Sequence, residues 1–474
     1  MKSEKVLSIF KDITRIPRES GHEEPMTAFL QRFAEERNLE CKTDRTGNVC
    51  IVKEASQGKE DVPTLVLQGH QDMVCEKRNG VAHDFLKDPI EYVIEDGWMI
   101  AKDTTLGADD GIGVAAMLAL LDSDLRMGRI ECVFTISEET GMDGAFGMEP
   151  GFFTGRTLIN LDSEDEGQMF IGCAGGLDTI AAFEYTTEEI KDGYMLVRLA
   201  IGGALGGHSG DDINKGRANT VQQMSRFLYS EMKHGLQLIT LQGGNKPNAI
   251  ARECEAVVAV PDAESTTARF ISFGEDLKNE YSKTDPGIAV ECCVCEAAGK
   301  PIRDDVAQRI ISSLFACPHG VEAMSQDIAG LVETSTNLAA VRIKSEGQVE
   351  IVTSQRSSTG SARRMMAEKV EANFLLAGAS VTHLSEYPGW KPNLDSHILR
   401  VCVDSYKRLF GCEPEVKAIH AGLECGLFGE KFGDLDMISF GPTLRGVHAP
   451  GERLELASLD RFTDHLIDVV TNFK

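Results

Sequence analysis

Strand and helix patterns alternate in the first third of the chain and again in its tail. The segments with these apolar patterns are Lys5–Ile16, Pro25–Arg37, Thr64–Leu67, Ile112–Leu121, Ile130–Ile136, Thr157–Leu161, Ser396–Phe410, Leu435–Phe440 and Ser458–Val470. This alternation favours a mainly parallel sheet with helices on both faces, because parallel strands need crossover connections. The sequence therefore predicts an α/β fold.

The middle of the chain has a different order of elements, and segments rich in Gly and Pro mark its two ends. These segments are Gly172–Gly176 and Tyr387–Pro392. Between them we expect two series of β-α-β-β-α-β order, the second without a clear first strand. The sequence thus predicts one discontinuous domain over 1–175 and 390–474, and an inserted α+β domain over 176–389 with a duplicated unit.

Composition excludes several classes of function. The chain has 48 Lys and Arg against 74 Asp and Glu, a net charge of −26, so nucleic acids and anionic membranes would be repelled. The longest apolar run, Val114–Leu121, is too short to cross a bilayer. The first residues show no signal-peptide pattern, and the 13 cysteines are scattered. We expect reduced thiols and a cytoplasmic protein.

Five segments combine a β-like apolar run or a turn with side chains that can bind metals. In an open α/β sheet, ligands bind at the carboxyl ends of the strands, where side chains from neighbouring strands converge. One such ending is unremarkable, but five acidic or imidazole endings predict a shared site. Their candidate residues are His70 and Asp72, Asp109 and Asp110, Glu138 and Glu139, Asp162, and His448.

Imidazole and carboxylate donors suit divalent metals, zinc first, although Mn²⁺ or Co²⁺ could use the same ligands. The set is large enough for two ions that share one carboxylate. Two ions about 3.5–4 Å apart can lower the pKa of a water and polarise a carbonyl together. Another carboxylate must then accept the water's proton. Glu138 and Glu139 can divide these roles, since adjacent strand residues point in opposite directions.

These residues resemble the motifs of the co-catalytic zinc exopeptidases of the aminoacylase/carboxypeptidase type. The matching motifs are His70-x-Asp72, Gly107–Gly111, Glu138–Gly141, the Asp162 segment and His448. Three further segments resemble the aminoacyl-histidine (Xaa-His) dipeptidase branch, the cytosolic non-specific dipeptidase type. They are Ile16–Glu24, Gln68–Val74 and Asn160–Asp165. The resemblance extends over essentially the whole chain and implies a zinc-exopeptidase-like sheet domain with an inserted lid.

The resemblance also implies a role for each residue of the site. Asp72 would orient His70, and Glu138 would be the general base. Asp110 stands where the branch is expected to have Asn, which we interpret as a charge adjustment. The implied metal ligands are His70 and Asp162 for one ion, Glu139 and His448 for the other, and Asp109 as the bridge.

In the inserted domain, the resemblance implies substrate-binding residues of a lid. His208 would stabilise the oxyanion of the tetrahedral intermediate, and Arg356 would bind a substrate carboxylate. Asn248 and Gly422 lie in matching segments. His208 and Arg356 belong to different copies of the repeat, so we expect both to serve their own chain, in a monomer or a homodimer. Relatives with a single-copy lid borrow such residues from a partner subunit.

The predicted reaction is metal-dependent hydrolysis of unblocked dipeptides, including Xaa-His substrates such as β-Ala-His. Two alternatives use the same scaffold: a tripeptidase, and an acyl-amino-acid amidohydrolase. A remote alternative from another class is a non-catalytic protein that binds a small ligand. Replacing Glu138 by Ala should separate these classes, because an enzyme would lose its rate while it retains metal.

Some candidate residues also have structural interpretations. Paired Glu138 and Glu139 could end a solvated strand, and Asp109 with Asp110 could cap the helix that follows. The segment Cys292–Cys295 raises a competing hypothesis, a thiolate metal or redox site. Its alternating pattern favours a strand with small buried thiols, because no second Cys pair stands at zinc-site spacing.

Overall fold

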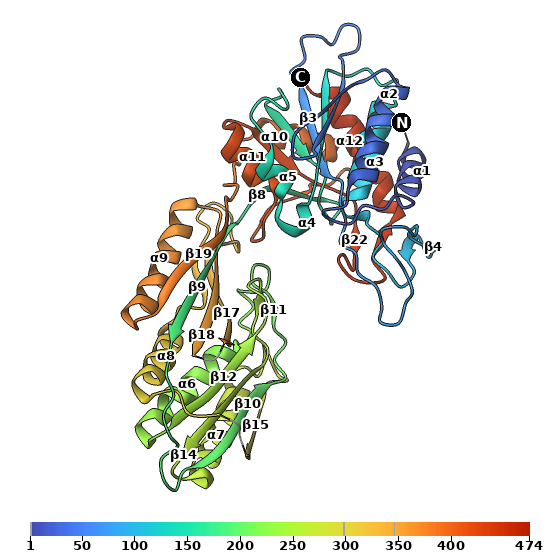
Figure 1. Ribbon diagram of the computed structural model, residues 1–474. Helices are drawn as coiled ribbons and strands as arrows, with labels where there is room; N and C mark the ends of the chain where they lie inside the picture. The colour runs from blue at the N-terminus through green and yellow to red at the C-terminus, as the bar shows by residue number, and fades with distance from the viewer. Residues whose placement is uncertain (1, 297–298, 346) are drawn as a thin grey trace. The chain divides into compact units, whose positions relative to one another are not determined.

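The computed structural model describes residues 2–296, 299–345 and 347–474 (Figure 1). The chain packs as two compact units. Unit 1 comprises Met1–Gly172, Trp390–Ala418 and Leu423–Lys474, and unit 2 comprises Cys173–Gly389 and Ile419–Gly422. The short stretch Ile419–Gly422 packs with unit 2 although it lies within the tail, which the sequence pattern did not indicate.

The main sheet of unit 1 has a parallel centre. Its strands follow the order β1-β2-β6-β3-β7-β21-β8-β20, and the central strands β6, β3, β7 and β21 run parallel to one another. β1, β2 and β8 pair antiparallel at the sides. The bounds are β1 Glu40–Thr43, β2 Val49–Lys53, β3 Leu65–His70, β6 Ile130–Thr135, β7 Thr157–Asn160, β8 Gln168–Cys173, β20 Glu415–Ile419 and β21 Asp436–Ser439.

The helices of unit 1 pack around this sheet. α1 packs against α3 and α12, and α12 also packs against α10. α3 lies against β3, and its residues from Gly111 to Leu121 are all buried. The bounds are α1 Ser3–Ile13, α2 Glu24–Glu36, α3 Ala108–Leu121, α4 Glu138–Gly141, α5 Asp143–Gly147, α10 His397–Phe410, α11 Glu424–Phe432 and α12 Leu456–Asn472.

Unit 1 also contains a small antiparallel sheet of order β22-β23-β5-β4. It joins a tail segment to residues near the start of α3, because β23 pairs with β5. The bounds are β4 Tyr92–Glu95, β5 Trp98–Ala101, β22 Leu444–Arg445 and β23 Arg453–Glu455.

Unit 2 contains one large antiparallel sheet of order β15-β10-β14-β12-β17-β18-β9-β19, with β16 paired to β17. A short β11-β13 pair stands apart from it. The strands are β9 Gly175–Glu184, β10 Met195–Gly202, β11 Gly207–His208, β12 Gln237–Gly244, β13 Ala249–Ile250, β14 Cys254–Val260, β15 Ala289–Val294, β16 Gly320–Met324, β17 Val332–Ser345, β18 Gln348–Ser357 and β19 Ser380–Tyr387. The helices are α6 Thr220–Glu231, α7 Ala263–Glu280, α8 Asp304–Ala316 and α9 Gly360–Leu376.

The sheet of unit 2 contains the duplicated β-α-β-β-α-β unit. The first copy is β10-α6-β12-β14-α7-β15, with spatial order β15-β10-β14-β12. The second copy has the mirrored order β17-β18-β9-β19, so β9 supplies the first strand that its own stretch of sequence lacks. β9 precedes the entire first copy along the chain. The first copy is therefore inserted between the first strand and the remainder of the second.

The cysteine-rich segment forms strand β15, as predicted, but the expectation of buried thiols is wrong. β15 is the edge strand of its sheet. The thiol of Cys292 forms a hydrogen bond with the side chain of Thr267 in α7 and is partly buried, whereas Cys293 is exposed. The alternating pattern correctly indicated a strand, but it could not indicate that the strand lies at an edge.

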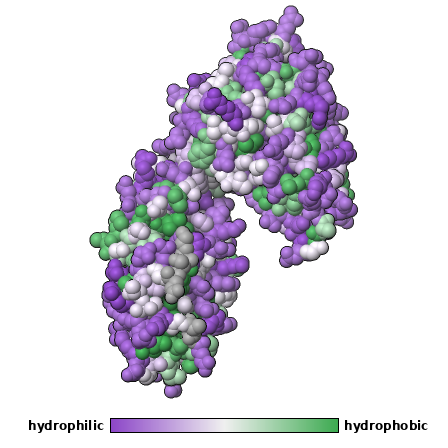
Figure 2. All heavy atoms as spheres, in the orientation of Figure 1, coloured by the Kyte–Doolittle hydropathy of each residue, from purple (hydrophilic) through white to green (hydrophobic). Residues whose placement is uncertain are grey.

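The visible surface of the molecule is largely hydrophilic, with scattered hydrophobic patches (Figure 2). This agrees with the excess of 74 acidic over 48 basic residues. Within the described ranges, none of the helices combines the length and the apolar character needed to cross a lipid bilayer.

Candidate metal centre

Strand order brings the predicted ligand segments to one edge of the main sheet of unit 1. β3 ends at His70, and its parallel neighbours β6 and β7 flank it. His70 is level with Thr135, the last residue of β6. Because parallel strands end at the same edge, Glu138, Glu139 and Asp162 follow β6 and β7 close to His70.

Two further segments complete this edge. Asp109 lies in the first turn of α3, the helix that packs on β3. His448 follows β22 in the small sheet. All five predicted metal ligands therefore belong to unit 1, although they come from five separate segments of the chain.

The five side chains form two groups that share Asp109. Asp109 Oδ1 lies 3.0 Å from His70 Nε2, which is 3.5 Å from Asp162 Oδ1. Asp109 Oδ2 lies 3.1 Å from His448 Nε2, which is 2.9 Å from Glu139 Oε2. Within each group the candidate ligand atoms lie within 4.8 Å of one another, and each group could hold a metal ion. One carboxylate with an oxygen toward each histidine is the arrangement that a bridging ligand requires.

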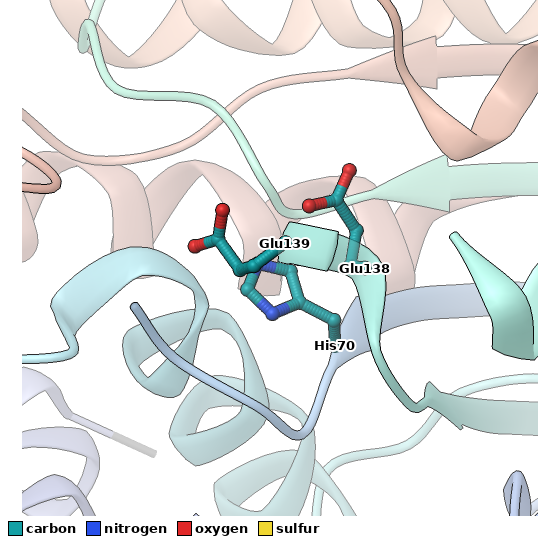
Figure 3. Close-up of side chains that lie close together, drawn as sticks. All are labelled: His70, Glu138 and Glu139. Atoms are coloured by element: carbon teal, nitrogen blue, oxygen red, sulfur yellow. The ribbon is translucent and has the colours of Figure 1, made fainter. Parts of the chain in front are cut away.

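Glu138 and Glu139 lie in a helical turn and not on a strand (Figure 3). They open α4, directly after Ser137, which has a left-handed φ of 50°. The prediction that Glu138 and Glu139 alternate on a strand and point in opposite directions is therefore wrong. Successive residues of a helix are about 100° apart around its axis, so the two carboxylates diverge without facing opposite ways. Both also form a third potential ligand group with His70.

Asp72 connects His70 to the turn that carries the two glutamates. Its side chain is fully buried, and Oδ1 lies 3.3 Å from His70 Nδ1. The backbone N–H of Glu138 donates to Oδ1 (3.1 Å), and that of Glu139 donates to Oδ2 (3.2 Å). Such a carboxylate fixes both the ring orientation of a ligating histidine and its tautomer. Asp72 thus positions groups on two neighbouring segments.

Burial and mutual repulsion disfavour Glu138 and Asp162 as anions, whereas hydrogen bonds to His448 and His70 lower the pKa of Asp109. Burial raises the pKa of Glu138 well above its ordinary value, and burial with the charge of Asp109 raises that of Asp162 to about 7. Hydrogen bonds to Asp109 and Glu139 raise the pKa of His448 to about 11. Divalent cations would supply the missing positive charge. With imidazole and carboxylate donors at this spacing, the residues fit divalent metal ions.

Asp110 has the capping role that its position suggested as an alternative. Its Oδ1 accepts the backbone N–H of Gly113 at 3.2 Å, as a helix-capping aspartate does. Burial raises the pKa of Asp110 well above its ordinary value, and the negative charge of Asp162 raises it further.

Sequence reasoning missed Glu452, which holds the segment in front of Asp109. This side chain is 1% exposed. Its carboxylate accepts the backbone N–H groups of Leu106 (2.8 Å), Gly107 (3.0 Å) and Ala108 (2.8 Å). No spacing rule connects Glu452 to a segment about 345 positions earlier, so no sequence signal could have identified it.

In unit 2, His208 lies on the short strand β11, and polar groups surround its Nδ1. The backbone N–H groups of Gly210 and Asp211 donate to Nδ1, each at 3.3 Å. Oδ2 of the Asp211 carboxylate lies 3.6 Å from the same nitrogen. When Nδ1 accepts in a neutral imidazole, the proton is on Nε2, which can donate a hydrogen bond to a ligand oxygen.

The other predicted residues of unit 2 are joined to His208 through its neighbour Ser209. Arg356 Nε donates to Ser209 Oγ at 3.2 Å, and Arg356 Nη1 donates to the hydroxyl of Tyr387 at 3.1 Å. The backbone N–H of Ser209 donates to the carbonyl of Asn248 at 2.8 Å. A Cβ atom at Gly422 would lie 2.9 Å from the Tyr387 ring, so only glycine fits there. The four predicted residues thus belong to one cluster.

Comparison with known proteins places this chain among peptidases. Residues 66–472 match Peptidase family M20/M25/M40. The cytosol non-specific dipeptidase of Escherichia coli (strain K12) is 36% identical over 466 residues, which cover 98% of this chain and 96% of the relative.

Solved structures agree with this relationship. The aminoacylhistidine dipeptidase from Vibrio alginolyticus has a TM-score of 0.90 and 38% identity, covering 99% of this chain and 96% of the other. A tripeptidase from Staphylococcus aureus subsp. aureus mu50 shares the fold at a TM-score of 0.58 and 16% identity, covering 99% of this chain and 98% of the other. The predicted fold class and enzyme family are thereby confirmed. The chain belongs to peptidase family M20/M25/M40.

Proposed function

We propose that this peptidase hydrolyses the peptide bond of unblocked dipeptides, Xaa-His dipeptides among them. The two ligand groups that share Asp109, with Glu138 beside them, carry the proposal. The relatives support the substrate class, since one is a cytosol non-specific dipeptidase and the other an aminoacylhistidine dipeptidase. The name of the first relative also supports a cytoplasmic location.

The proposed cofactors are two divalent ions, zinc first and Mn²⁺ or Co²⁺ as alternatives. When bound, two such ions supply Lewis acidity toward a water molecule and toward the scissile carbonyl. The ligands of one ion would be His70, Asp109 and Asp162, and those of the other Asp109, Glu139 and His448.

Glu138 is the proposed general base. It would accept the proton of the attacking water and return it to the leaving amine. Two features of the structure support this role. Burial raises the pKa of its carboxyl group, which favours proton uptake. The hydrogen bond from its backbone N–H to Asp72 holds the turn in place next to His70.

Unit 2 would supply substrate-binding groups. His208 would donate a hydrogen bond from Nε2 to the developing oxyanion, and the backbone N–H groups of Gly210 and Asp211 on its Nδ1 orient the ring. Arg356 would bind the carboxylate of the dipeptide with its planar guanidinium group, which Ser209 and Tyr387 orient. Asn248 and Gly422 belong to the same cluster and would shape it.

Substrate preference can be tested with β-Ala-His, Ala-His, Gly-Gly, Leu-Leu, a tripeptide and an N-acetyl amino acid. Each is offered to chelator-stripped protein, before and after addition of Zn²⁺ or Mn²⁺. We expect metal-dependent cleavage of the free dipeptides. Cleavage of the tripeptide alone, or of the acetylated substrate alone, would replace the proposed substrate while keeping the metal site.

Replacement of Glu138 by Gln tests the chemical step. The variant should lose at least about a hundredfold in kcat, the usual effect of removing a general base, and should still bind two ions. Retained activity in this variant would refute the assignment of Glu138 as the general base. A wild-type protein that binds metal but cleaves no substrate of the panel would favour the non-catalytic binding protein. Mixing chains with His208→Ala and chains with Glu138→Gln should restore no activity if each chain uses its own residues.

A further inference from the structure

The segment Arg18–Glu23, between α1 and α2, contacts three segments that carry residues of the metal centre. It runs beside the end of β3, where Glu19 pairs with Met73 in a parallel bridge. The backbone N–H of Met73 donates to the carbonyl of Arg18 at 3.1 Å. No residue of this segment belongs to the ligand groups described above.

Arg18 joins the His70–Asp72 segment to the Asp109 segment. Its side chain is 2% exposed, and Nη1 donates to the carbonyls of Gln71 (3.0 Å) and Asp72 (2.6 Å). Nη2 donates to the carbonyl of Gly107. A Cβ atom at Gly107 would lie 2.4 Å from Nη2, and one at Gly111 would lie 2.6 Å from it. The glycines on both sides of Asp109 and Asp110 therefore leave space for this guanidinium group.

Ser20 acts on the carboxylate that holds His70. Its hydroxyl donates to Asp72 Oδ2 at 2.7 Å. This is the oxygen that also accepts the backbone N–H of Glu139. Without the hydroxyl, Asp72 would lose one of the donors that fix its plane, and His70 would lose part of its orientation.

Glu23 holds the turn in front of Glu138. It is 5% exposed, and its Oε1 accepts both the backbone N–H and the hydroxyl of Ser137 at 2.9 Å. Ser137 has a left-handed φ of 50°, which is uncommon for a residue with a side chain. The two hydrogen bonds of Glu23 stabilise that conformation and with it the direction of the turn.

We propose that Arg18–Glu23 is a positioning segment that sets metal affinity. Together its three polar side chains contact three ligand-bearing segments. Arg18 and Ser20 contact residues 70–72, Arg18 also contacts Gly107, and Glu23 contacts the turn of residues 137–139. The segment touches no reacting atom in this role. The inference deepens the proposed function, because it assumes that the site binds divalent metal.

Two variants of the full-length protein test the segment. Ser20→Ala removes the hydroxyl that bonds to Asp72, and Glu23→Ala removes the oxygen that accepts both hydrogen bonds from Ser137. Zn²⁺ affinity is measured by chelator competition on stripped protein, and kcat and KM are measured at saturating Zn²⁺. Ser20→Thr, which retains the hydroxyl, should restore the affinity.

Two polar residues of unit 1 provide matched controls. None of the hydrogen bonds described for them reaches the metal centre. Ser405 is 1% exposed and donates to Asp468 at 2.6 Å, so Ser405→Ala matches Ser20→Ala. Glu131 lies at the opposite end of β6 and accepts the backbone N–H groups of Thr154 (2.7 Å) and Gly155 (2.9 Å). Glu131→Ala therefore matches Glu23→Ala.

We expect Ser20→Ala and Glu23→Ala to weaken Zn²⁺ binding about 10- to 100-fold, as changes behind a metal ligand do, with KM nearly unchanged. The controls should bind Zn²⁺ like the wild type even where they lower stability. Wild-type affinity in both test variants, or equal losses in the controls, would overturn the inference. A wild-type protein that binds Zn²⁺ but cleaves no dipeptide overturns the proposed substrate alone, and one that binds no metal overturns both.

Discussion

Replacing Glu452 by Gln should destabilise unit 1 and weaken metal binding together. Glu452 Oε2 accepts the N–H groups of Leu106 and Gly107, and Oε1 accepts those of Ala108 and, at 3.4 Å, Asp109. A Gln side chain has one oxygen, and its NH₂ group cannot accept a hydrogen bond. Two buried backbone N–H groups would lose their acceptor whichever way the amide is oriented.

The size of the effect follows from the cost of buried unpaired donors. Each costs about 1–3 kcal/mol, so the free energy of unfolding should fall by about 2–6 kcal/mol. Because these N–H groups belong to the segment that ends at Asp109, the shared ligand should also lose its position. We therefore expect Zn²⁺ affinity to fall by about tenfold or more, as it does when groups that orient metal ligands are removed.

Urea unfolding monitored by tryptophan fluorescence measures the first effect. Both tryptophans of the chain, Trp98 and Trp390, lie in unit 1, so the signal reports on that unit. Chelator competition measures the second effect. Glu131→Gln is the control, since it should cost stability without changing Zn²⁺ affinity. A loss below about 1 kcal/mol, or unchanged metal affinity in Glu452→Gln, would refute the reasoning.

Three further predictions concern other parts of the molecule. Gly422→Ala should lower the free energy of unfolding by about 1–3 kcal/mol, because the added methyl group would overpack against Tyr387. An unchanged thermal unfolding midpoint would contradict this close contact. Arg356→Lys should raise KM for dipeptides about tenfold or more with little change in kcat, because lysine lacks the planar guanidinium group that binds a carboxylate with two hydrogen bonds. Steady-state kinetics measure both constants, and an unchanged KM would show that Arg356 does not bind substrate. Burial lowers the pKa of His465 from its ordinary 6.5 to about 4, so the unfolded chain takes up the proton first as pH falls. The contribution of His465 to the free energy of unfolding is fully present above pH 6.5 and is lost as the pH falls toward 4. About 2 kcal/mol of this contribution is lost between pH 7.5 and pH 5. His465→Gln should lack this part of the pH dependence in urea unfolding, and an identical pH profile would show that the group titrates normally.

The candidate metal ligands could be proposed from sequence because their signal is local. A β-like run that ends in His70 or Asp162 shows both the candidate ligand and its place at a strand end. The side-chain types then indicate the class of metal. The comparisons confirm the enzyme family to which these motifs pointed. The same local reasoning failed for Glu138 and Glu139, since a helical turn directly after β6 cannot be distinguished from the end of the strand.

The fold of unit 2 could be predicted only in part. Strand and helix periodicities correctly indicated the repeated element order. They could not show that β9 completes the second copy, because β9 is separated from that copy by all of the first. Strand pairing is decided by long-range contacts, and single-sequence patterns contain no information on which edge a strand will join.

By itself, the sequence determined which side chains can bind metal and which family they resemble. Only the tertiary structure decided how those side chains are held. Asp109 is set between His70 and His448 by Glu452, and Glu138 is set in its turn by Glu23. These supporting groups lie 344 and 114 positions away from the residues that they contact. A ligand is recognised by its own chemistry, whereas a supporting residue is defined only by the neighbour that folding brings to it.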